Sequence, residues 1–141
     1  MAKTVKVNLR EELPFDIKEV WRVVVQDFQD CWWRSDISAV EASGEDSFIE
    51  YTKDGYETKF TVTERQPYER WEFDMENGNM KGRWTGLFYG SDGKTTVDFT
   101  EEVSVKKFYM RPFAGRYLKR QQTRYIEDLK KALNGEGTDW K

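Results

Sequence analysis

Histidine is absent from this chain of 141 residues, and cysteine occurs once, as Cys31. A chain without imidazole cannot build a Ser-His-Asp triad, a Cys-His pair or a histidine-ligated metal site. A single cysteine also excludes an intramolecular disulfide, and such sparing use is typical of a reducing compartment. We therefore expect a cytoplasmic protein that holds no metal and no cofactor.

Long apolar runs and an excess of positive charge are missing too. No stretch approaches the roughly 18 apolar residues of a membrane-spanning helix, and the N-terminus lacks the apolar core of a signal peptide. The net charge of −3 gives no overall field that would attract nucleic acid. The length suits one domain with one core, which we place at residues 1–141 with a flexible tail at 134–141.

Aromatic residues are what the chain has in plenty. They make up 16% of it, while all hydrophobic residues together reach only 38%. Large rings pack a curved sheet well, but they rarely fill it without gaps. The composition therefore favours a core that encloses some space.

The first segments change from the period of a strand to that of a helix. Apolar and polar side chains alternate over residues 5–10, which predicts a strand that Pro14 ends. Asp16 follows as an N-cap, with Glu19 as its capping-box partner. The apolar face of the helix that they begin consists of Ile17, Val20, Trp21, Val24, Val25 and Phe28. A second short helix or turn should occupy residues 26–36.

Period-two alternation returns after this segment and continues to Lys107. Turn signals divide the stretch at Ser43-Gly44-Glu45-Asp46, Asp54-Gly55, Gln66-Pro67, Asn77-Gly78-Asn79 and Ser91-Asp92-Gly93. Between the turns, apolar side chains alternate with charged or hydroxylated ones, so one face of the sheet should be dry and the other wet. We predict about six antiparallel strands here and about seven in total.

A long amphipathic helix should close the chain. Pro112 suits its first turn, and Asn134-Gly135 provides a C-cap signal. Steps of about 100° per residue place one stripe along it that consists of Ala114, Leu118, Gln121, Tyr125, Leu129 and Ala132. We therefore predict an α+β fold in which a curved antiparallel sheet wraps the C-terminal helix, with two short helices after the first strand.

Local motifs accompany this order of elements: Pro14-Phe15-Asp16-Ile17-Lys18-Glu19-Val20-Trp21, Trp33, Gly82-Arg83-Trp84-Thr85-Gly86-Leu87-Phe88 and Asp92-Gly93-Lys94-Thr95. Together they resemble the helix-grip fold of the START-like superfamily, also called SRPBCC, over about residues 4–133. Polyketide cyclase-like proteins and relatives of the birch-pollen allergen belong to it. The resemblance implies a cavity for an apolar small molecule between the sheet and the final helix. It leaves the reaction open, because the superfamily also includes enzymes and chaperone activators.

The candidate ligand contacts are mostly aromatic residues of the dry face and the final helix: Trp33, Phe60, Trp71, Phe73, Trp84, Phe88, Phe99, Tyr117 and Tyr125. They could line a ligand cavity, or they could fill the core, as inward-facing rings usually do. The resemblance to START-like proteins implies that some of them surround a pocket, and both arrangements stay open.

Gln121 is the sharpest polar candidate, because it lies in the apolar stripe of the final helix between Leu118 and Tyr125. A buried amide needs hydrogen-bond partners, since an unpaired one costs about 1–3 kcal/mol. Its partner could be a ligand in the cavity. A tyrosine, a strand carbonyl or a buried water could serve equally well.

Glu101 is the second polar candidate. Alternation from Val97 and Phe99 places it on the dry face, where a desolvated carboxyl has a raised pKa and could transfer a proton. In the alternative, a bulge or strand end lets Glu101 reach solvent or an arginine. The adjacent Glu102 would then exchange places with it.

Basic residues gather on the final helix. Arg111, Arg116, Lys119, Arg120, Arg124, Lys130 and Lys131 outnumber Glu127 and Asp128 there. This surface could attract an acidic partner or an anionic membrane. It could equally be a solvated outer face.

Three functional hypotheses follow. The first is binding of a small, mostly apolar molecule, lipid-like or polycyclic, between sheet and helix, with Gln121 and Glu101 as orienting contacts. The second is a cyclase-like or hydrolase-like enzyme in which Glu101 transfers a proton. The third is a protein-interaction module similar to chaperone activators, which requires a filled core and an exposed apolar patch. A homodimer is left open.

Overall fold

The computed structural model describes residues 4–26 and 34–136, and within them seven strands form one antiparallel sheet in the order β1-β7-β6-β5-β4-β3-β2. The strands are β1 (Thr4–Leu13), β2 (Ile37–Ala42), β3 (Ser47–Thr52), β4 (Glu57–Gln66), β5 (Arg70–Glu76), β6 (Met80–Ser91) and β7 (Lys94–Val105). The helices are α1 (Ile17–Trp21), which continues as a π turn over Arg22–Gln26, and α2 (Arg111–Lys131), with a 3₁₀ turn (Phe108–Met110) before it and a π turn (Ala132–Glu136) after it. The predicted α+β helix-grip class is confirmed.

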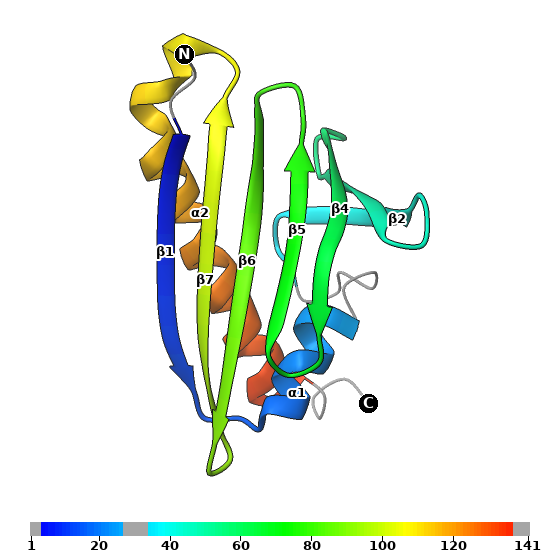
Figure 1. The fold of residues 1–141 in the computed structure, drawn as a ribbon, viewed down its shortest axis with the longest axis vertical. Helices are drawn as coiled ribbons and strands as arrows, with labels where there is room; N and C mark the ends of the chain where they lie inside the picture. The colour runs from blue at the N-terminus through cyan, green and yellow to red at the C-terminus, as the bar shows by residue number, and fades with distance from the viewer. Residues whose placement is uncertain (1–3, 27–33, 137–141) are drawn as a thin grey trace.

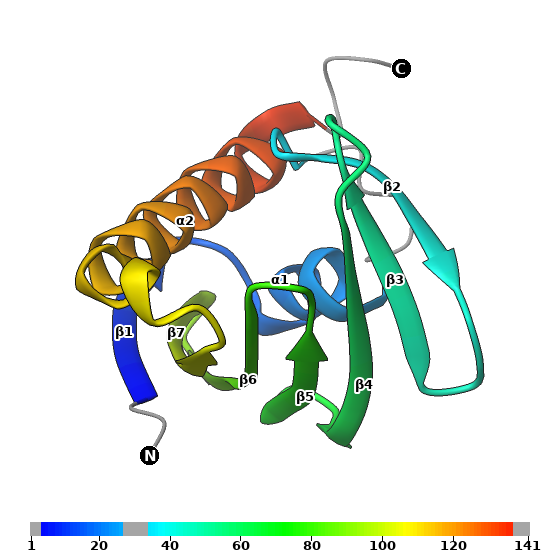
Figure 2. The same ribbon diagram turned by 90° about the horizontal axis from the view of Figure 1, so that it is seen from above.

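The sheet curves around α2. In Figure 2 the strands form an open trough, with β1 at one edge, β2 and β3 at the other, and α2 across its mouth. The helix α1 lies on the same side of the sheet, near the end where β6 and β7 meet in a hairpin (Figure 1). Each predicted turn signal joins two neighbouring strands of this sheet.

The strand β7 lies between β1 and β6 and pairs with both along its length. Its register with each neighbour is unbroken, and its side chains alternate between the two faces. The inward set consists of Thr95, Val97, Phe99, Glu101, Val103 and Val105, all buried. The period of two read from the sequence is therefore the period of the structure.

The helix α1 begins where the sequence predicts. The Asp16 carboxylate accepts the backbone N–H of Lys18 at 3.0 Å and caps the helix. The cap does not take the capping-box form, because the N–H of Glu19 binds the Asp16 carbonyl instead. A second short helix or turn was predicted over residues 26–36. Residues 27–33 lie outside the described residues, and residues 34–36 are not helical.

The buried stripe of α2 differs from the predicted one. It contains Ala114, Leu118, Gln122, Ile126 and Leu129, whereas Gln121 is exposed. The prediction that Gln121 is the buried amide of this helix is therefore wrong. The contact line follows rows of residues four apart, which slant across a helix surface, because α2 crosses the sheet obliquely (Figure 1). The predicted stripe continued from Leu118 to Gln121, three residues on, whereas the buried row continues to Gln122, four residues on.

The C-terminal end of α2 also differs from expectation. Residues 134–136, which we predicted as the start of a tail, continue the helix as part of a π turn. Residues 137–141 lie outside the described residues. The helical segment therefore extends slightly past the Asn134-Gly135 signal.

Gly86 in β6 leaves room for the indole of Trp84, which lines the concave face. A Cβ atom at position 86 would lie 2.6 Å from indole atom Cζ3 and 3.3 Å from Cδ1 of Phe99. We predict that Gly86→Ala displaces the indole and lowers the free energy of unfolding by about 1–3 kcal/mol, the usual cost of overpacking. Urea denaturation measures the loss.

Gly78→Ala provides the matched control, because a Cβ there meets only the Tyr56 hydroxyl, at an ordinary 3.5 Å. We expect little change in stability for this variant. Equal losses at positions 78 and 86 would show that the indole is not the obstacle.

Candidate ligand-binding site

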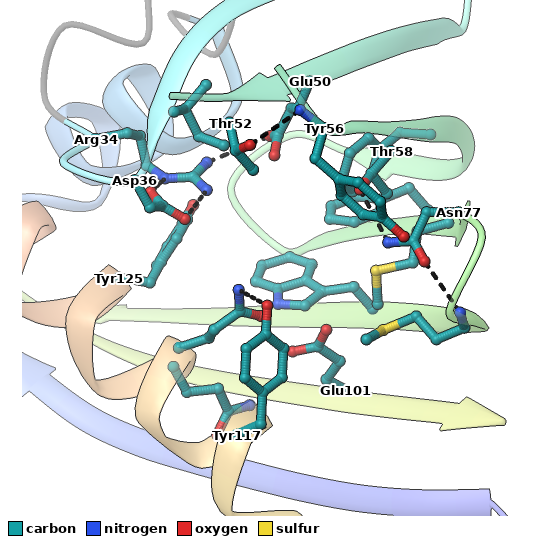
Figure 3. Close-up of a pocket in the computed structure, with 18 of the residues that line it drawn as sticks. Arg34, Asp36, Glu50, Thr52, Tyr56, Thr58, Asn77, Glu101, Tyr117 and Tyr125 are labelled. Carbon is teal, nitrogen blue, oxygen red and sulfur yellow. Dashed lines mark hydrogen bonds and ion pairs between the residues drawn. The ribbon is translucent and has the colours of Figure 1, made fainter. Parts of the chain in front are cut away.

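A cavity of about 160 Å³ lies between the concave face of the sheet and α2 (Figure 3). Its apolar lining consists of Ile37, Phe60, Phe73, Met75, Met80, Trp84 and Phe99. Its polar lining consists of Arg34, Asp36, Glu50, Thr52, Tyr56, Thr58, Asn77, Glu101, Tyr117, Gln121, Gln122 and Tyr125. The interior is therefore not completely filled, and the unfilled part carries charged groups.

Most of the predicted contact residues meet in this cavity: Phe60, Phe73, Trp84, Phe99, Glu101, Tyr117, Gln121 and Tyr125. Trp71 and Phe88 are buried but do not line it. Trp71 packs edge-on against Phe73, and Phe88 packs edge-on against Trp21 of α1. Trp33 lies outside the described residues. The role of these residues as ligand contacts remains a prediction.

The aromatic wall of the cavity is held rigid by ring contacts around Trp84. Its indole stacks on Phe73 with centroids 5.0 Å apart and lies 4.7 Å from the ring of Phe99. Tyr125 of α2 closes over both, with centroids 6.3 Å from Trp84 and 5.8 Å from Phe99. Each such pair contributes about 0.5–1.5 kcal/mol beyond burial. The rings of this wall therefore hold one another in place.

Arg34 forms the centre of a charged cluster at the other side of the cavity. Its Nε and Nη2 atoms donate to the two carboxylate oxygens of Asp36, both at 3.2 Å, and Nη1 donates to Glu50 at 3.3 Å. The guanidinium also lies over the ring of Tyr125, 5.0 Å from its centroid. Burial alone would lower the pKa of Arg34, but the charges of Glu50 and Asp36 outweigh it and raise the pKa.

The loop that carries Arg34 is attached to the final helix. The backbone N–H and the hydroxyl of Ser35 both donate to the Asp128 carboxylate, at 2.9 and 2.8 Å. Asp128 is buried in α2, so it positions the loop against the helix. The arginine cluster is therefore fixed from both the sheet and the helix.

Arg34, Asp36 and Glu50 are lining residues that were not predicted from the sequence. A signal existed for Glu50, because counting by two from the inward-facing Phe48 places it on the dry face. Burial raises the pKa of Glu50, although the Arg34 charge opposes the shift. No periodic pattern marks Arg34, which lies in an irregular segment before β2.

Glu101 is buried, with 8% of its surface exposed, and points into the cavity beside Tyr117 (Figure 3). It lies between Val7 of β1 and Trp84 of β6 in a register without a bulge. The alternative in which a bulge turns Glu101 toward solvent is therefore wrong. Among the described residues none donates a hydrogen bond to its carboxyl group. Burial and the nearby charge of Glu50 raise its pKa to about 7, and Arg34 offsets part of this rise.

Two adjacent glutamines of α2 have different roles. Gln122 is buried, and its Nε2 atom donates to the carbonyls of Phe99 at 3.2 Å and Val7 at 3.5 Å. Its Oε1 atom is buried without a partner among the described residues. Gln121 donates to the Tyr117 hydroxyl at 3.0 Å at the exposed rim. Gln122 thus anchors the helix to strand carbonyls, and Gln121 braces a tyrosine at the cavity mouth.

Exposed aromatic residues continue outward from this mouth along α2. Phe113 and Tyr117 lie one turn apart on the helix and are both exposed, as is Tyr56 on the other side of the pocket.

No helix in the described part of the chain combines the length and apolar character that crossing a membrane requires. Nor do any three acidic or cysteine residues in 4–26 and 34–136 approach closely enough to hold a metal ion.

A curved antiparallel sheet that wraps a C-terminal helix over a ring-lined cavity defines the class of START-like, helix-grip proteins. The chain belongs to the family described as polyketide cyclase / dehydrase and lipid transport, whose pattern matches residues 4–134. No curated protein sequence matches the chain.

Solved structures share the fold at low sequence identity. A START superfamily protein from Mycobacterium smegmatis matches with a TM-score of 0.78 and 13% identity, over 92% of this chain and 97% of its own. A conserved protein from Geobacillus kaustophilus matches with a TM-score of 0.77 and 16% identity, over 92% and 95%. Norcoclaurine synthase from Thalictrum flavum, solved with dopamine and hydroxybenzaldehyde, matches with a TM-score of 0.70 and 12% identity, over 93% and 87%.

The buried carboxyl of Glu101 predicts a pH dependence of stability. Its pKa is about 7 in the folded protein and 4.5 ordinarily, so between these values the folded state keeps a proton that the unfolded state releases. The free energy of unfolding that this group contributes therefore falls as the pH rises from 4.5 to about 7. We predict that Glu101→Gln gains stability over the parent protein by about 2–3 kcal/mol more at pH 8.5 than at pH 5.

Urea unfolding at the two pH values measures this difference. Glu102→Gln serves as the control, because Glu102 is the next residue of β7 and points to the exposed face. Its effect on stability should be the same at both pH values. An equally flat result for Glu101→Gln would contradict the raised pKa.

Proposed function

We propose that the protein binds a small, mostly apolar molecule with a single ring in the cavity between the sheet and α2. The observation that carries this proposal is the ring-lined cavity of about 160 Å³. An engineered apolar cavity of about 150 Å³ holds benzene, whereas drug-sized ligands need about 300–1,000 Å³. A lipid-like or polycyclic ligand would need the rim side chains Tyr56 and Tyr117 to move apart.

Two comparisons support this proposal. The family description covers both cyclases and lipid transport, functions that act on molecules with large apolar parts. Norcoclaurine synthase was solved with dopamine and hydroxybenzaldehyde, each of which contains one aromatic ring. The chaperone-activator hypothesis is less well supported, because it requires a filled core. A cytoplasmic location and a homodimer stay predictions from the sequence.

A pair of phenylalanines tests the site. Phe99 lines the cavity, whereas Phe88 is equally buried, on the neighbouring strand β6, but does not line it. We predict that the parent protein binds ethylbenzene more tightly than naphthalene. Phe99→Leu should shift this preference toward naphthalene about fivefold. The smaller side chain leaves room for part of the second ring of naphthalene, whose added apolar contact is worth about 1 kcal/mol.

Titrations followed by amide chemical shifts give the affinities. Phe88→Leu should leave the preference between the two probes unchanged. No binding of either probe to the parent protein would refute the proposed function. An equal effect of the two variants would place the binding site elsewhere.

A second candidate function is proton transfer on a bound carbonyl compound. Glu101 favours it, because a carboxyl group with a pKa of about 7 inside an apolar cavity can act as a general acid or base at neutral pH. The predicted enzyme hypothesis retains its base, since this carboxyl faces the cavity rather than solvent.

Deuterium exchange at the methylene group of phenylacetaldehyde, followed by NMR, tests this candidate. We predict exchange above the buffer rate, with an inflection near pH 7, and a loss of about 10²–10⁴-fold in Glu101→Gln, the usual contribution of a general base. Glu102→Gln should retain the parent rate. Exchange at the buffer rate in the parent protein would exclude this function.

A further inference from the structure

The charges that line the cavity are unbalanced. Arg34 is its one cationic lining residue, and Asp36, Glu50 and Glu101 are its carboxyl groups. When all three carboxyl groups are ionised, the cavity has a net charge of −2. No lysine or further arginine contributes to the described lining. An anionic ligand would therefore enter against repulsion.

The single guanidinium is already engaged. All three of its nitrogen atoms donate to Asp36 or Glu50, and its face lies over the Tyr125 ring. The charge of Arg34 affects the pKa of Glu101 less than burial and the charge of Glu50 do. Arg34 is therefore neither a receptor for an anionic head group nor a direct partner for Glu101.

Of the three carboxyl groups in the described lining, Glu101 is the one that Arg34 does not hydrogen-bond. More than nine-tenths of its surface is buried, it points into the cavity, and among the described residues it receives no hydrogen bond. A carboxylate in an apolar surrounding is costly unless it accepts hydrogen bonds. A donor in this position must come from the contents of the cavity.

The surrounding rings favour the same kind of group. Trp84 is directly paired with Glu101 across the sheet, and the Tyr117 ring lies beside its carboxyl group. Negative ring faces attract a cation that is also bound to a carboxylate. A charge-assisted N⁺–H···O⁻ bond inside such a site is about twice as strong as a neutral hydrogen bond.

We propose that the ligand is an arylalkylamine with a single ring, whose ammonium group binds Glu101 while its ring packs on Trp84 and Phe99. This inference rests on the proposed function, since it names the chemical class that the cavity takes. The labelled residues Glu50 and Glu101 lie on opposite sides of the pocket (Figure 3), so a cation inside it is near two carboxyl groups. The size of the cavity limits the chain between ring and nitrogen to a few atoms.

Three probes of one shape test the head group: 2-phenylethylamine, 2-phenylethanol and 3-phenylpropionate. Each has a phenyl ring on a two-carbon chain, and they carry a cation, a neutral donor and an anion. We expect calorimetry at pH 8 to show the amine binding about tenfold more tightly than the alcohol, as for a charge-assisted bond over a neutral one. The anion should bind more weakly than both.

The variants assign the preference to one residue. Glu101→Gln should remove the advantage of the amine and change the affinity for the alcohol by less than about threefold, because the amide keeps the shape and loses the charge. Glu102→Gln should keep the advantage of the amine, because this carboxyl lies on the exposed face.

Each of the other possible outcomes contradicts one part of the proposal. If the alcohol binds and the amine binds no better, the charge preference is wrong and the proposed function stands. If the amine keeps its advantage in Glu101→Gln, Glu101 is not its receptor. If no probe binds the parent protein, the proposed function fails and this inference fails with it.

Discussion

The pairing of β7 with both of its neighbours is the constraint on which the rest of the structure depends. Its unbroken registers bury Val97, Phe99 and Val103, and alternation then buries Glu101 as well. A slip by one residue would expose the apolar side chains, each worth about 1.5–3 kcal/mol. A raised carboxyl pKa costs about 3 kcal/mol at high pH. The apolar set outweighs the carboxyl group, so Glu101 stays inside.

A second strand repeats this conflict and resolves it differently. Alternation on β3 turns Glu50 inward with Phe48, and there Arg34 supplies a counter-charge. The pair is fixed from α2 through Ser35 and Asp128. A buried ion pair adds little stability by itself, since desolvation offsets attraction, but an arrangement that separates the two partners leaves a buried charge uncompensated. The cluster therefore specifies how the loop before β2 packs against α2.

The sequence predicts those features of this fold that follow from a regular period. Alternation and turn residues are local, so the strands, the hairpins and the inward position of Glu101 could be found from them. The choice between Gln121 and Gln122 could not, because it depends on the angle at which α2 crosses the sheet. Arg34 meets Glu50 through tertiary contact alone. The cavity volume depends on how Trp84 lies over Gly86, a matter of angstroms.

The interior is divided into a filled end and a hollow end. Near α1, Val20, Trp21 and Leu13 pack with Phe88 and Val97 without lining the cavity. Under α2, a dry void of about 160 Å³ would cost at most about 4 kcal/mol by the scaling measured for engineered cavities. Water on its polar side reduces this cost, and an occupant that fills it removes more. The filled end thus supplies stability that the hollow end does not. Because both ends belong to one core, a ligand that fills the cavity should raise the stability of the whole domain.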